Sequence, residues 1–123
     1  MSGLQFKILA DDFRIRLKAS EDVLINYNAE GVAHANDYLM KLRETIPMED
    51  LLKYTDSIAC YLGETVIAMY GGKWKYFHDY EQWGITFGGN EWFFPVHYVK
   101  QQIQGNSHET IYTALASLNR GVA

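Results

Sequence analysis

The stretch YLGETVIAMYGGKW at residues 61–74 changes its pattern part-way, and this change decides the fold. Up to Tyr70 its apolar residues recur at helical spacing, whereas the residues from Trp74 onward alternate with a period of two. Gly71 and Gly72 lie between the two patterns, and glycine ends a helix without steric cost because it adopts the left-handed conformation. The stretch therefore predicts a helix that ends at the two glycines and is followed by strands.

A helix from about Met48 to Tyr70 is predicted to run through the core. Apolar positions recur along one face of it, at Leu51, Tyr54, Ile58, Leu62, Val66 and Met69. In its second half the apolar residues at 60, 67 and 68 surround Glu64, and a helix that is apolar on all sides is enclosed by protein. Gly63 costs about 1 kcal/mol in a helix interior, and we expect close packing of another group to offset this cost.

Two further helices are expected upstream. Residues 28–46 carry an apolar face, with Asn28 as the N-cap and Pro47 as the residue that ends the helix. Residues 4–20 fit a short amphipathic helix, but the alternation of apolar residues over 13–17 fits a strand as well. We expect a helix in this segment.

Downstream of Gly72 the chain reads as a three-stranded antiparallel meander. Three segments are rich in aromatic and β-branched residues: WKYFH (74–78), QWGITF (82–87) and EWFFP (91–95). The GGN sequence at 88–90 has the chemistry of a tight hairpin turn. Gly84, inside a strand, predicts either a bulge or the close approach of a helix.

Two helices are expected after the sheet. The first covers VHYVKQQIQG (96–105) and ends at Gly105, and the second is capped by Ser107, with Glu109 in its first turn. The predicted fold is thus α+β: helices, then a small three-stranded antiparallel meander, then two C-terminal helices. No linker or repeat is visible, so we expect a single domain over 1–123.

The amino-acid composition and the net charge limit the classes of protein to which this chain can belong. The 123 residues are 48% hydrophobic and 15% aromatic, which is enough for one packed core. The formal net charge is −4, the opposite of the basic surplus typical of nucleic-acid-binding proteins, and anionic membranes repel such a charge. The single cysteine, Cys60, forms no internal disulfide, and neither a signal peptide nor a transmembrane segment is visible. We therefore expect a cytoplasmic domain that binds neither nucleic acid nor membrane.

Four segments together resemble a group of small uncharacterised bacterial proteins. They are NYNAEGVAHANDYLMKLR (26–43), YLGETVIAMYGGKW (61–74), WGITFGGNEWFFP (83–95) and VKQQIQG (99–105). The residues that match the pattern of the group are Asn26, Tyr27, Leu62, Gly63, Glu64, Gly71, Gly72, Trp74, Phe94, Pro95, Lys100 and Gly105. The resemblance covers residues 26–115 and implies one intact domain in a bacterial or phage setting. It transfers no catalytic residue.

Glu64 is the first candidate for a functional role. As a general acid or base it would have a pKa raised by its apolar surroundings. As a structural acceptor, its carboxylate would take hydrogen bonds from the Trp74 indole, from a tyrosine hydroxyl or from N–H groups near Gly71, because a buried charge without partners costs several kcal/mol. The sequence places no second acid or nucleophile beside it, so we favour the structural interpretation.

Other reactive side chains form no recognisable site. Cys60 and His97 could in principle form a nucleophile–base pair, which we weigh at about one in twenty because a free cysteine is commonly a small buried hydrophobe. The histidines at 34, 78, 97 and 108 lack the spacing of a metal site on a helix. The glycine-rich turns lack a phosphate-binding pattern. We expect no metal and no cofactor.

The ten aromatic residues between positions 74 and 98 need an explanation. They are Trp74, Tyr76, Phe77, Tyr80, Trp83, Phe87, Trp92, Phe93, Phe94 and Tyr98. A sheet that packs on helices buries one face, so alternation sends about half of them outward. Each residue alone fits core packing, whereas the group has an even chance of forming an exposed binding strip. The predicted binding residues are Glu64, Trp74, Trp83, Trp92 and His97, and no catalytic residue is predicted.

Two classes of function fit these patterns. The first is an interaction module whose partner is another protein. A toxin-neutralising immunity protein is its concrete form, since an acidic protein is steered rapidly onto a basic toxin. Eleven of the 15 acids lie in residues 1–64, which predicts an acidic helical half. A homodimer or a homo-oligomeric scaffold subunit is the plainer form of this class. The second class is a small enzyme that uses Glu64 as general acid or base, with His97 or a tyrosine.

Overall fold

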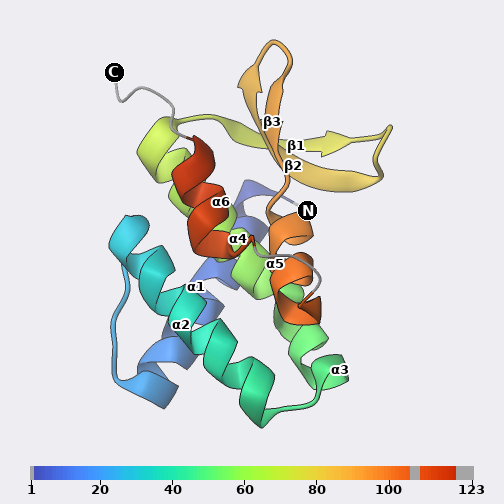
Figure 1. Ribbon diagram of the computed structural model, residues 1–123. Helices are drawn as coiled ribbons and strands as arrows, with labels where there is room; N and C mark the ends of the chain where they lie inside the picture. Colours follow the sequence, from blue (N-terminus) through green and yellow to red (C-terminus); the bar gives the residue numbers. More distant parts are fainter. Residues whose placement is uncertain (1, 106–108, 119–123) are drawn as a thin grey trace.

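Helix α4 (Thr55–Tyr70) runs through the middle of the molecule, and the other elements are arranged around it (Figure 1). The computed structural model describes residues 2–105 and 109–118. Helix α1 (Gly3–Glu21) packs along α4, and the sheet lies at one end of the helices. The predicted α+β order of helices, meander and C-terminal helices is confirmed.

The prediction of one continuous helix over 48–70 is wrong near its start. The chain forms a short helix α3 (Met48–Leu51) and a 3-10 turn η1 (Leu52–Tyr54) before α4 begins. The Thr55 N–H donates to the Leu52 carbonyl, three residues back, whereas a regular α-helix bonds residues four apart. The Thr55 hydroxyl donates to the same carbonyl at 2.7 Å. Apolar periodicity continues across the break and therefore does not reveal it.

The second half of α4 is also less enclosed than predicted. Ala68 is exposed, and Glu64 and Ile67 are half-buried. Glu64 and Ala68 lie one turn apart on the same side of the helix, so this side faces solvent. On the opposite side Leu62 and Val66 are fully buried, as predicted.

The helix predicted over residues 4–20 is confirmed as α1. Its start is fixed by a capping box, in which the Ser2 N–H donates to Gln5 Oε1 at 2.6 Å and the Gln5 N–H donates to Ser2 Oγ at 3.4 Å. Apolar residues occupy two sides of α1: Phe6, Ala10, Phe13 and Leu17 are buried, whereas Leu4, Ile8 and Ile15 are exposed. This double pattern explains why periodicity fitted both a helix and a strand.

Helix α2 (Ala29–Thr45) begins and ends as predicted. The Asn28 side chain accepts a hydrogen bond from the Gly31 N–H at 2.8 Å, and Ile46 is extended ahead of Pro47. The loop before α2 is held to the core because the Tyr61 hydroxyl of α4 donates to the Asn26 carbonyl.

The strands are β1 (Lys73–Phe77), β2 (Gln82–Gly88) and β3 (Glu91–Phe93), and they pair antiparallel in the order β1-β2-β3. Gly88 and Gly89 both have positive φ, at 95° and 58°, in the tight turn predicted between β2 and β3. The bulge lies between Thr86 and Gly88, and not at Gly84. The group that approaches Gly84 is the ring of Phe94, and not a helix.

After the sheet the chain forms α5 (Pro95–Gln104), which ends at Gly105 in the left-handed conformation, and α6 (Ile111–Leu118). The Ser107 cap lies outside the described residues. Glu109 precedes α6, and does not belong to its first turn as predicted. Instead the Thr110 hydroxyl accepts from the Thr113 N–H at 3.2 Å, and the cap at Thr110 lies three residues after the predicted cap at Ser107. No helix within the described ranges is long and apolar enough to cross a membrane.

Candidate functional site

The two faces of the sheet carry different sets of aromatic residues. The pairs Trp74–Ile85 and Tyr76–Trp83 lie on the face toward the helices, because paired residues share a face. Phe77 lies on the opposite face, and so does Trp92, which is paired with Thr86. The predicted binding residues are thus divided between the two faces.

The inner face forms a network that joins three of the predicted site residues. The Trp74 indole Nε1 donates to Glu64 Oε2 at 2.8 Å. The Trp74 ring stacks on Phe6 of α1, with centroids 4.0 Å apart and planes within 10° of each other, and Trp83 contacts Phe6 edge-on at 5.1 Å. A Cβ at Gly63 would overlap the Trp74 ring, which confirms the predicted packing role of this glycine. Glu64 therefore has the hydrogen-bond donor that the structural interpretation named.

Four rings gather on the outer face, and we call Phe77, Tyr80, Trp92 and Phe94 the outer aromatic cluster. Phe77 contacts Trp92 and Phe94 at centroid distances of 5.9 and 5.0 Å, and Tyr80 contacts the same two rings at 6.3 and 5.5 Å. Tyr80 and Trp92 remain 55% and 43% exposed. The four rings therefore form one contiguous surface that reaches solvent.

Gly84 provides the space in which this cluster forms. A Cβ at Gly84 would lie 2.7 Å from Cδ1 of Phe94, closer than packed carbon atoms approach. The Phe94 ring therefore lies flat over the strand only because residue 84 has no side chain. This placement brings Phe94 into contact with both Phe77 and Tyr80.

Charged residues lie close in the sequence to residues of the outer aromatic cluster. Asp79 and Glu81 flank Tyr80 in the exposed turn between β1 and β2, and neither forms an ion pair with another described residue. Lys75 Nζ lies 5.1 Å from the centroid of the Phe77 ring, so the cluster already holds one ammonium group of its own chain. The surface combines π faces with carboxylates, which is the chemistry that binds cations.

The remaining candidates lie apart from both networks. His97 is exposed on α5, where its ring meets that of Tyr98 edge-on at 5.2 Å. Cys60 is buried, and burial together with the nearby carboxylates of Asp56 and Glu64 raises the pKa of its thiol to about 12. A thiol with this pKa remains protonated at neutral pH and is a poor nucleophile. The pairing of Cys60 with His97 therefore gains no support.

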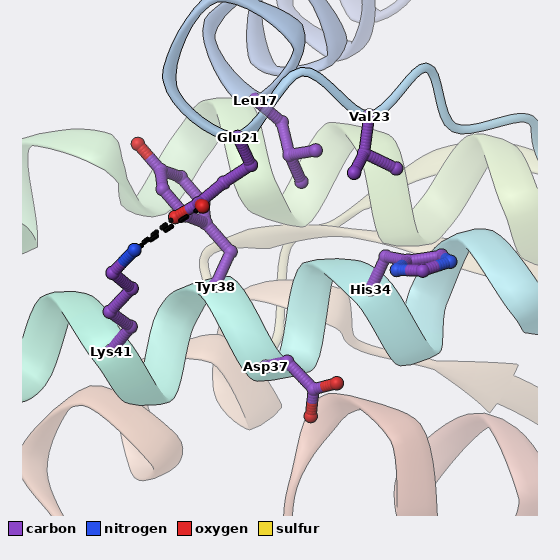
Figure 2. Close-up of a pocket in the computed structure, with 7 residues that line it drawn as sticks. All are labelled: Leu17, Glu21, Val23, His34, Asp37, Tyr38 and Lys41. Carbon is purple, nitrogen blue, oxygen red and sulfur yellow. Dashed lines mark hydrogen bonds and ion pairs between the residues drawn. The ribbon is translucent and has the colours of Figure 1, made fainter.

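A small pocket of about 200 Å³ lies between the end of α1 and α2, and the sequence patterns did not indicate it. Figure 2 shows Leu17 and Val23 pointing into it from above, while Asp37 points away from Glu21. Glu21 and Lys41 form an ion pair across its mouth at 3.0 Å. No three His, Cys, Asp or Glu residues among the described positions are grouped so that they could hold a metal ion.

Comparisons with models of protein families, with curated proteins and with solved structures find no match to this chain. The resemblance to a bacterial group and the identity of any partner therefore stay predictions. Three of the cluster residues, Phe77, Tyr80 and Phe94, were not among the predicted binding residues. Strand alternation from Trp74 places Phe77 outward, but Tyr80 lies in a turn and Phe94 follows β3, where alternation gives no information.

Proposed function

We propose that this protein is a protein-interaction module whose outer aromatic cluster binds a basic segment of a partner protein. The observation that carries the proposal is the cluster itself, in which four rings contact one another and two of them are exposed. A contiguous exposed aromatic surface is typical of a binding site. Trp and Tyr are also enriched among the residues that dominate binding energies.

The chemistry of the surface favours a basic partner. The face of a tryptophan or tyrosine ring attracts an arginine or lysine side chain, and the attraction is about 2 kcal/mol or more once the pair is shielded from water. Lys75 over Phe77 is an internal example of this contact. The open carboxylates of Asp79 and Glu81 add hydrogen-bond acceptors for a guanidinium group beside Tyr80.

A toxin-neutralising immunity protein is the concrete form of this function that we propose. Residues 1–64 carry eleven acids against seven lysines and arginines, whereas residues 65–123 carry four of each, so the net charge of −4 arises in the helical half. The resulting field accelerates the approach of a basic protein, and the cluster then supplies short-range contacts. We make no proposal for an enzyme that uses Glu64, because the carboxylate is engaged by Trp74.

The test begins with capture of a partner from the native host, followed by identification and purification of that partner. Titration then compares Trp92→Ala with Tyr112→Ala, because the two residues are 43% and 42% exposed and Tyr112 lies on α6, outside the cluster. We expect Trp92→Ala to weaken binding by about 30-fold or more, as for a dominant interface residue. Tyr112→Ala should leave the affinity within about twofold, since surface changes outside an interface have small effects.

Further outcomes separate the parts of the proposal. Binding that weakens as salt concentration rises is expected for a basic partner. Binding unaffected by both Trp92→Ala and Tyr80→Ala would remove the cluster from the interface. Capture of nothing but a second copy of this chain would replace the proposal with the scaffold alternative. For the immunity form, the captured protein must arrest growth of the host cell when this chain is absent and lose that effect when it is present.

A further inference from the structure

A second cavity opens between α1, α2 and the start of α4, at the end of the helices far from the sheet (Figure 1). Its volume is about 360 Å³, within the range of small-molecule sites. Phe13, Leu42, Ile46 and Ile58 provide most of its apolar lining. Tyr54, the last residue of the 3-10 turn η1, lines it as well. The segment at the break before α4 therefore contributes one residue to the wall of the cavity.

Among the described residues that line the cavity, Arg16 alone carries a full charge. Its guanidinium carbon lies 5.1 Å from the centroid of the Tyr54 ring, and Arg16 forms no ion pair with any described residue. None of the described residues that line the cavity is acidic, although the chain has 15 acids. Glu21, which follows a lining residue, pairs instead with Lys41. An unpaired guanidinium at an apolar cavity is complementary to an anionic group.

Tyr38 completes the polar part of the wall. Its hydroxyl donates to Ser20 Oγ at 3.2 Å, which links α2 to α1 across the cavity. Tyr38 also lines the pocket of Figure 2, where it points from α2 toward the end of α1. The Tyr38 side chain therefore lies between the apolar cavity and the ion pair of Glu21 with Lys41.

We propose that this cavity binds a small amphipathic anion, an apolar chain that ends in a carboxylate, with the carboxylate paired to Arg16. At about 30 Å³ per non-hydrogen atom, the liquid-like value for water, the 360 Å³ holds about twelve such atoms, the size of a ten-carbon fatty acid. The chain would lie against Leu42 and Ile46, which are half-buried, and against the exposed Ala19, and would lose contact with water. The guanidinium fork matches the geometry of a carboxylate and fixes the orientation of the ligand.

The test uses decanoate as the probe and decan-1-ol as its uncharged counterpart, each titrated into the full chain by calorimetry. Arg16, Ala19 and Arg43 are all exposed, so substitutions there leave the core intact. Arg16→Gln removes the charge, Ala19→Phe fills the cavity from its rim, and Arg43→Gln removes an arginine of α2 that does not line it. Circular dichroism and the thermal midpoint verify that each variant is folded.

We expect saturable binding of one decanoate per chain. Arg16→Gln should weaken decanoate binding by about tenfold or more and leave decan-1-ol binding unchanged, because only the acid uses the charge. Ala19→Phe should weaken both probes, and Arg43→Gln should weaken neither. Absence of saturable decanoate binding below its micelle-forming concentration would overturn the proposal, and so would wild-type affinity in both Arg16→Gln and Ala19→Phe. Equal affinity of the wild-type chain for both probes would overturn the assignment of an anionic ligand.

Discussion

On the inner face of the sheet Trp74 is held by groups from two helices, whereas on the outer face Trp92 contacts the rings of Phe77 and Tyr80, which come from β1 and the turn after it. Trp74 stacks on Phe6 of α1 and donates to Glu64 of α4. Trp92 packs beside Phe77 and Tyr80, and 43% of it remains exposed. Both tryptophans belong to the same sheet. The ring that Trp74 stacks on comes from the first helix, whereas the rings that Trp92 contacts come from a nearby part of the sequence.

This difference indicates which aromatic contacts the fold requires. The stacking of Trp74 on Phe6 joins α1 to β1 across most of the chain, so it forms only when α1 and the sheet come together. The outer aromatic cluster is built entirely from residues 77–94, a single stretch of chain. A local cluster that covers little of the core can be altered at small cost to stability, and this freedom suits a surface that binds a partner.

The largest expected contrast is between Trp74→Ala and Trp92→Ala in the free energy of unfolding. Trp74→Ala removes a stacked ring and leaves Glu64 without its donor, so we expect a loss of about 3 kcal/mol. Trp92→Ala should cost about 1 kcal/mol or less, because the ring is largely exposed. Urea unfolding at equilibrium measures both values. Equal losses would show that the outer ring is part of the core and not a free surface.

A second comparison is between two glycines. Gly63 packs against the Trp74 ring on the inner face of the sheet, and Gly84 packs against the Phe94 ring on the outer face. In Gly63→Ala the new methyl group would overlap Trp74, which is fixed by α1 and Glu64, so overpacking should outweigh the helix-propensity gain and cost about 1–2 kcal/mol. In Gly84→Ala the methyl group would push against Phe94, which is half-buried and can move toward solvent. We expect Gly84→Ala to change stability by less than about 1 kcal/mol.

The same two variants should have opposite effects on binding. Gly84→Ala displaces Phe94 from the outer aromatic cluster and should weaken partner capture. Gly63→Ala should leave capture intact once the fraction of folded protein is taken into account. Thermal unfolding and titration on the same preparations separate these effects. A loss of capture in Gly63→Ala alone would place the binding surface on the inner face.

The sequence predicted most of the elements because each is defined by local chemistry. Asn28, Pro47 and the glycine pair at 71–72 mark helix ends through short-range backbone rules, and the structure bears them out. The break at 52–54 escaped prediction because its backbone bonds join residues three apart instead of four and leave the apolar spacing unchanged. The predictions that are confirmed rest on interactions among a few residues that are neighbours in the sequence.

The site was predicted less completely, for the same reason. The Trp74 indole could be named as a donor to Glu64 because the two residues lie on either side of the helix end, ten positions apart in the sequence. Phe6 could not be named as the stacking partner, since no pattern links α1 to β1 across the chain. The apolar cavity needs three helical segments to meet, and its Arg16 carries no signature that distinguishes it from other surface arginines.

The last comparison, for which we expect the smallest changes in stability, is between two carboxylates. Glu64 lies on the inner side, and Glu81 lies beside the outer aromatic cluster. Glutamine at 64 can still accept from the Trp74 indole, and because Glu64 is half-buried its amide group can face water. A hydrogen bond to a charged acceptor is stronger than one to a neutral acceptor, so Glu64→Gln should cost about 1 kcal/mol of stability. Partner capture should be unchanged.

Glu81→Gln should give the reverse result. Glu81 is exposed and forms no ion pair with another described residue, so its replacement should leave the free energy of unfolding unchanged within about 0.5 kcal/mol. Capture of a basic partner should weaken, and the weakening should disappear at high salt, where charges are screened. The paired measurement is thermal unfolding and titration of both variants at low and high salt. If Glu64→Gln kept its stability and lost capture, Glu64 would be the binding residue and the inner face would be the functional one.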